Sequence, residues 1–275
     1  MNAIAAKVSN AIVDAIEADR LVLPTMPEMA LRVREVAEDD DASVQGLAKV
    51  IGSDAALTAR IIKVANSAIY RGAKEIEDLN MALMRLGMAT TCTLATGLAM
   101  EQMFQATSDM VDKRLRKTWA QSTEIAGMST VLCKHYTKLR PEQATLAGLM
   151  HLIGVLPILS YAEQYSALLK DSITLESIIK AVHPKIGSKI LEAWDFPQEI
   201  LNVPSAHLDF TRTATQPDYA DIVTVALLQS RSAEYEFIDY TTVTAFDRLG
   251  LDPNIESAEA EDLSAEMAEA VNLLK

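Results

Sequence analysis

The chain has 275 residues, of which 49% are hydrophobic and 23% are charged, so it can bury a substantial core in one large domain or two modest ones. Its 38 acidic and 25 basic residues give a formal charge of −13, which opposes binding to phosphate backbones and to anionic lipid surfaces. We therefore expect neither nucleic acid nor a membrane among its partners.

Cysteine usage and the N-terminus favour a cytoplasmic protein. Cys92 and Cys133 lie in apolar stretches and share no spacing typical of metal ligands. Residues 1–20 lack a basic leader followed by a continuous apolar core, so they do not resemble a signal peptide. The longest uncharged stretch, 144–162, contains glycine, histidine and proline, and we interpret it as a buried core helix.

Helical spacing of apolar residues dominates the pattern along the chain. It is clearest over three short stretches, which are residues 44–51, 57–65 and 79–86. Ser43, Asp54 and Asp78 precede them as candidate N-caps, and Gly87 follows the third as a stop. Alternating patterns typical of strands are nearly absent, so we predict no sheet.

The densest basic cluster is Lys113, Arg114, Arg116 and Lys117. No aromatic residue lies between these side chains to stack on a base, so we interpret them as the solvated first turns of a helix.

Prolines mark predicted joints in the second half of the chain. Pro184 predicts a helix break at His183, because the residue before proline avoids helical backbone angles. Pro197 is predicted to open a short helix, and the polar residues 209–218 are predicted to form a loop. The acidic tail from Ala258 is helix-prone. We expect its single apolar stripe to dock on the body or on a second copy of the chain. The stripe comprises Leu263, Met267, Val271 and Leu274.

Two segments carry a family resemblance. The first runs over residues 21–70 and includes a Leu-Pro opening and the helix DAALTARIIKVANSA, followed by ALMRLG at 82–87. The second is HPKIGSKILEAWDFPQEI at 183–200. Both resemble the HDOD (HD-related output domain) family, a degenerate relative of the HD and HD-GYP metal-dependent phosphohydrolases.

The resemblance implies an all-α fold, a multi-helix HD-like bundle with an N-terminal helical subdomain. It implies an HDOD domain at 21–215, divided into an N-terminal helical part at 21–110 and a degenerate HD-like part at 111–215. Residues 1–20 would form an N-terminal helix, and 216–275 would form C-terminal helices packing on the same body.

Catalytic HD relatives hold one or two metal ions through a first His, a His-Asp doublet and a later Asp, and the ion activates a water for attack on a phosphate ester. Compared with that pattern, Gln121 stands at the position of the first His, and Leu152 follows His151 where the Asp should stand. At the last position the chain has Ala226-Leu227, although Asp221 lies nearby and fills the position if the register differs by one or two turns.

The remaining histidines allow two interpretations. His151, His183 and His207 either converge on a vestigial site for a divalent metal such as zinc, or are hydrogen-bonded residues that line or plug the former pocket. We favour the second interpretation, with no cofactor and no catalytic residue. The candidates for the degenerate pocket and its ligand are Gln121, His151, His183, His207, Asn66 and Ser67.

Asn66 and Ser67 also have a structural interpretation, as the cap of a helix end with Tyr70 packing beneath.

The predicted function is a non-catalytic signalling output or scaffolding module that binds a signalling protein or a small nucleotide-like ligand at the degenerate pocket. The alternative is a divergent metal-dependent phosphohydrolase that uses His151, His183 and His207 on a phosphodiester or nucleotide. A third interpretation is a nucleotide sensor that has kept the pocket and lost the chemistry.

Overall fold

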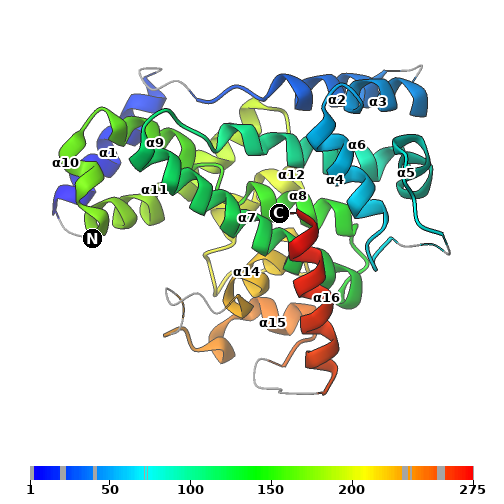
Figure 1. Cartoon of the computed structure of the whole chain (residues 1–275). Coiled ribbons are helices and arrows are strands. Elements are labelled where there is room, and N and C mark those ends of the chain that lie inside the picture. Colours follow the sequence, from blue (N-terminus) through cyan, green and yellow to red (C-terminus); the bar gives the residue numbers. More distant parts are fainter. Residues whose placement is uncertain are drawn as a thin grey trace.

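The structure, a computed structural model, describes residues 3–18, 23–39, 42–70, 72, 74–230, 235, 237–252 and 258–274. Within these ranges the chain forms α-helices and short 3-10 helices and no strand, which confirms the all-α prediction (Figure 1). The predicted boundary between residues 20 and 21 lies outside the described residues.

The N-terminal half consists of short helices. Its helices are α1 (Ala3–Glu17), α2 (Glu28–Glu38), α3 (Val44–Ile51), α4 (Ala55–Ala65), α5 (Leu79–Leu86), α6 (Met88–Ala99) and the 3-10 helix η1 (Met100–Met103). Helices α2 to α6 contact one another, whereas α1 packs far from them on α11 (Ser172–Ala193).

The predicted helix caps are confirmed. The side chains of Ser43, Asp54 and Asp78 accept hydrogen bonds from backbone N–H groups in the first turns of α3, α4 and α5, at 3.0 to 3.1 Å. Gly87 ends α5 with a φ of +80°, a conformation that favours glycine over residues with a Cβ. These local signals fix where each short helix begins and ends.

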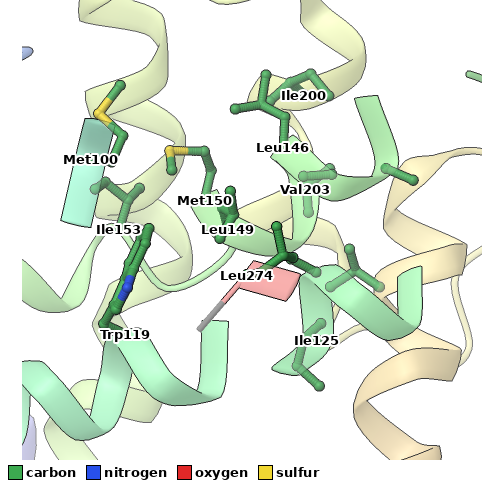
Figure 2. Close-up of a cluster of buried hydrophobic side chains, with 14 of the residues drawn as sticks. Met100, Trp119, Ile125, Leu146, Leu149, Met150, Ile153, Ile200, Val203 and Leu274 are labelled. Atoms are coloured by element: carbon green, nitrogen blue, oxygen red, sulfur yellow. The ribbon is translucent and has the colours of Figure 1, made fainter. Parts of the chain in front are cut away.

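The second half is built around the long helix α7. Its helices are α7 (Asp109–Tyr136), α8 (Pro141–Met150), α9 (Val155–Glu163), α10 (Ser166–Lys170), α11, α12 (Gln198–Leu201) and α13 (Val203–Ala206). Helix α8 lies against α7 so closely that a Cβ on Gly148 would stand 2.4 Å from the Cα of Ala126. Figure 2 shows part of the core, to which Trp119 and Ile125 of α7 and Leu149 of α8 contribute their side chains.

The C-terminal segment packs on the same body. Its elements are α14 (Tyr219–Gln229), the 3-10 helix η3 (Tyr240–Thr242), α15 (Thr244–Leu249) and α16 (Ala258–Leu274). Helix α16 contacts α7 and α4, and it buries Met267, Val271 and Leu274 (Figures 1 and 2). The apolar stripe of the tail therefore docks on the body, one of the two sites predicted for it.

Two predictions of helix boundaries are wrong. Helix α11 continues through Pro184, although proline removes one hydrogen bond of the helix, because His183 and Ile186 on either side are anchored in the core. The stretch 144–162 is not one helix, since α8 ends at Met150 and a turn precedes α9. Together Pro141–Glu163 are long and apolar enough to cross a membrane, but 89% of the most apolar window is buried inside the protein.

Candidate functional site

Three histidines that are far apart in the sequence meet in the core. His151 follows α8, His183 lies within α11 and His207 follows α13. The ring centroids of His151 and His207 are 5.2 Å apart, and those of His183 and His207 are 5.7 Å apart. All three side chains are buried, with at most 3% of each residue exposed. We refer to these residues as the histidine cluster.

Glycines allow the helices that carry the cluster to approach one another. A Cβ on Gly154, just before α9, would stand 2.1 Å from the His183 carbonyl oxygen of α11. A Cβ on Gly187 would stand 2.7 Å from the Cβ of Pro204 in α13. The contact at Gly154 is with backbone atoms, and the contact at Gly187 is with a rigid proline ring. Rotation of a side chain therefore cannot make room for a larger residue at Gly154. The glycines thus set the positions of the imidazoles.

Backbone carbonyls orient two of the rings. His151 Nδ1 lies 2.6 Å from the Gly148 carbonyl oxygen, and His207 Nδ1 lies 3.0 Å from that of Val203. A carbonyl only accepts, so each Nδ1 carries the proton and each Nε2 is the unprotonated nitrogen of a neutral ring. Among the described residues, His151 Nε2 and His183 Nδ1 are buried without a hydrogen-bond partner.

Burial keeps the histidine cluster neutral. It lowers the pKa of His151 to about 3, with a further contribution from His207. It lowers the pKa of His207 to about 4 and that of His183 well below its ordinary value. The three imidazoles therefore carry no charge at neutral pH, and none of them is poised to act as a general acid there.

The cluster does not fit the metal centre of catalytic HD proteins. Within the described ranges, no group of three or more His, Cys, Asp or Glu side chains is arranged to hold a metal ion. Leu152 and Gln121, at the positions that the family resemblance assigns to metal ligands, supply at most a neutral amide. No described Asp or Glu joins the three imidazoles in a metal-binding group, so none is placed to balance the charge of a divalent ion.

Asp221, the residue close to the last ligand position, is held by two arginines. Its Oδ1 accepts from Arg248 Nη2 at 2.6 Å and its Oδ2 from Arg248 Nε at 2.9 Å, and Arg212 also contacts Oδ1. Asp221 further takes part in the capping box at the start of α14, together with Asp218. Both carboxylate oxygens are thus occupied, which indicates a structural role.

A cavity of about 840 Å³ opens beside the histidine cluster, between α7, α9 and α11. Gln121, Leu152 and His183 line it, whereas His151 and His207 are not among its described lining residues. The two positions that the family resemblance assigns to the first His and to the doublet Asp therefore line the cavity, and His183 is the member of the histidine cluster described at its wall.

Asn66 and Ser67 lie elsewhere. Asn66 ends α4, donates to the Ile76 carbonyl at 2.7 Å and accepts from the Ile76 N–H at 2.9 Å, so it ties down the chain before α5. Ser67 lines a second, much smaller cavity with Tyr70 and Leu274. This arrangement agrees with the structural interpretation of the pair.

The basic side chains that line the larger cavity were not predicted as pocket residues from the sequence. Lys113 and Lys117 do lie exposed in the first turns of α7, as predicted, but they also face the cavity. A signal was present, because Lys113, Lys117 and Gln121 follow one another at intervals of four residues and so share one face of a helix.

Comparison with known proteins identifies the family and the fold. The HDOD domain model matches residues 23–210. A crystal structure of a proposed metal-dependent phosphohydrolase from Shewanella amazonensis is 30% identical, with a TM-score of 0.89 over 98% of this chain and 99% of that one. An HDOD domain protein of unknown function from Geobacter sulfurreducens is 18% identical, with a TM-score of 0.65 over 98% and 99% of the two chains.

An uncharacterized protein from Treponema pallidum is 24% identical over 205 residues, which is 69% of this chain. The match spans 38% of the length of that curated relative. Both the all-α fold and the family resemblance predicted from the sequence are confirmed by these matches.

Proposed function

We propose that this chain, which belongs to the HDOD domain family, is a non-catalytic signalling module that recognises a small ligand in the cavity beside the histidine cluster. The observation that carries the proposal is the presence of Gln121 and Leu152 on the cavity wall at the positions aligned with metal ligands. A pocket with an amide and an isobutyl group at these positions can still bind a ligand of matching shape. It lacks the imidazole and carboxylate ligands that would hold a water-activating metal ion.

The chemistry of the cluster supports the same proposal. Burial lowers the pKa of His183, the one cluster member at the cavity wall, well below its ordinary value. At neutral pH its ring can accept or donate one hydrogen bond to a ligand, but it carries no charge that stabilises a phosphorane-like transition state. We further propose that ligand occupancy is what a signalling partner of the protein senses.

A divergent metal-dependent phosphohydrolase is the second candidate. Two observations favour it: the 30% identical structure from Shewanella amazonensis is named as a proposed enzyme of that class, and buried nitrogens of His151 and His183 have no partner among the described residues. Orphaned imidazole nitrogens are what metal ligands leave when no ion is present.

A turnover assay separates the two candidates. Protein purified without a histidine tag is incubated with bis(p-nitrophenyl) phosphate and with Mg²⁺, Mn²⁺ or Zn²⁺ in turn. We expect nitrophenol release no faster than in the protein-free control. Metal-dependent release that disappears in His151→Gln, while circular dichroism shows the variant to be folded, would establish the phosphohydrolase and remove the non-catalytic proposal.

A further inference from the structure

The cavity beside Gln121 is basic, although the chain as a whole has a formal charge of −13. Among its described lining residues, one carboxylate contributes, that of Glu176. The basic side chains that line it are Lys113, Arg114, Lys117, Lys170 and Lys180. Helices α7, α10 and α11, which are separate in the sequence, thus bring cations to one opening, and the local charge is opposite to that of the molecule.

Within the described part of the chain, three of these cations have no ionic partner. Arg114 pairs with Glu176 at 2.8 Å and so neutralises the carboxylate found among the described lining residues. In the part of the chain that the structure describes, Lys113, Lys117 and Lys170 make no ion pair. Lys113 and Lys117 are also four residues apart on α7, where two like charges repel each other and destabilise a helix. An anion between these lysines would relieve that repulsion.

The inner part of the same cavity is apolar. Val155 and Leu159 of α9 and the nearby Leu169 are buried, and all three line the cavity, whereas the lysines are exposed. His183 lines it too, with 3% of the residue exposed and with a buried Nδ1 that has no partner among the described residues. A cavity of this size lies within the range of about 300–1,000 Å³ that is typical of small-molecule sites.

We infer that this cavity binds an organic phosphate, with the phosphate group at Lys113, Lys117 and Lys170 and an apolar body against Val155, Leu159 and Leu169. A phosphate monoester carries between one and two negative charges at neutral pH and accepts several hydrogen bonds, which matches a set of unpaired ammonium groups. The inference rests on the proposed function, because it names the ligand class for the same cavity.

The probe for the test is 1-naphthyl phosphate, whose fluorescence reports binding and whose hydrolysis releases 1-naphthol. We expect saturable binding to the full chain that weakens with added salt, and weaker binding of inorganic phosphate and of 1-naphthol, because each lacks one half of the recognised structure. The double variant Lys113→Gln/Lys117→Gln should bind 1-naphthyl phosphate about tenfold more weakly, the loss expected from one charge-assisted hydrogen bond.

The matched control is Lys49→Gln/Lys138→Gln, which removes the same charge at two exposed lysines outside the cavity lining and should leave affinity unchanged. Equal losses in the two double variants, equal affinity for inorganic phosphate, or no binding by the wild type would overturn the inference. Naphthol release would instead overturn the non-catalytic proposal, and the phosphate site would stand if Lys113→Gln/Lys117→Gln still weakened binding.

Discussion

The imidazole rings of His151 and His207 meet edge to face in the core, with centroids 5.2 Å apart and planes at 86°. Each ring donates its Nδ1 proton to a backbone carbonyl near the end of its own helix. Protonation of either ring would place a buried cation beside a second imidazole, and among the described residues no Asp or Glu is grouped with these rings to compensate it. The pair is therefore stable only in its neutral form.

Acidification should destabilise the protein through these rings. The folded-state pKa of His151 is about 3 and lies below the ordinary value of 6.5, so the unfolded chain takes up the proton first as the pH falls. The stabilisation is complete above about pH 6.5 and is lost toward the folded-state pKa. Below about pH 6, each such histidine should lower the free energy of unfolding by about 1.4 kcal/mol per pH unit.

Urea unfolding at about pH 7 and about pH 5.5 measures this dependence. We expect His151→Gln to lose about 1.4 kcal/mol of the pH-dependent difference, because glutamine does not titrate. The control is His135→Gln, which alters a histidine whose side chain is 41% exposed. An unchanged pH dependence in His151→Gln would show that His151 is accessible to protons in the folded state.

The ion pairs of Asp221 should be structural. Asp221 is 1% exposed and bonds to both Arg212 and Arg248, so Asp221→Asn leaves two partly buried guanidinium groups without their shared anion. We expect the free energy of unfolding to fall by about 3–5 kcal/mol. Thermal unfolding of the wild type and of Asp221→Asn, each with and without Zn²⁺, tests this structural role directly. If Asp221 is structural, Zn²⁺ should change the unfolding temperature of the two proteins equally. A stabilisation by Zn²⁺ that only the wild type shows would identify Asp221 as a ligand.

Gly154 should tolerate no side chain. In Gly154→Ala the new Cβ would stand 2.1 Å from the His183 carbonyl oxygen, so α9 and α11 must move apart. Overpacking of this kind costs about 1–3 kcal/mol, and it should also weaken binding in the cavity that α9 and α11 line. The matched control is Gly46→Ala in α3, where the nearest atom is Ser43 Oγ at 3.2 Å. Equal stability of Gly154→Ala and Gly46→Ala in urea titrations would contradict the close approach of α9 and α11.

Local chemistry explains which parts of the fold could be predicted. The caps at Ser43, Asp54 and Asp78 depend on residues within three positions of the hydrogen bond that they accept, and all three are where the sequence placed them. The docking of Met267 and Val271 follows from an apolar stripe on one helix face, but the sequence did not show whether the stripe packs on the body or on a second copy of the chain. Packing on the body depends on the space at Gly127, where a Cβ would stand 2.6 Å from the Val271 nitrogen.

Tertiary contacts explain what the sequence could not reveal. Pro184 has the local signal of a helix end, yet contacts of α11 with α1, α9 and α13 keep the helix continuous. The basic character of the cavity depends on Lys170 of α10 lining the same cavity as Lys117 of α7, a relationship between segments that no local pattern encodes. The family resemblance brought His151, His183 and His207 together as candidates, but only the structure separated His183, at the cavity wall, from the other two.

Metal analysis of tag-free protein tests the central claim most directly, namely that a cavity bordered by Gln121 and Leu152 no longer holds a hydrolytic metal centre. The protein is purified without chelators, and its divalent metals are measured by mass spectrometry beside those of His151→Gln. We predict substoichiometric metal in both proteins, with no difference between them. About one Zn²⁺, Mn²⁺ or iron ion per chain in the wild type, lost in a folded His151→Gln, would contradict the account.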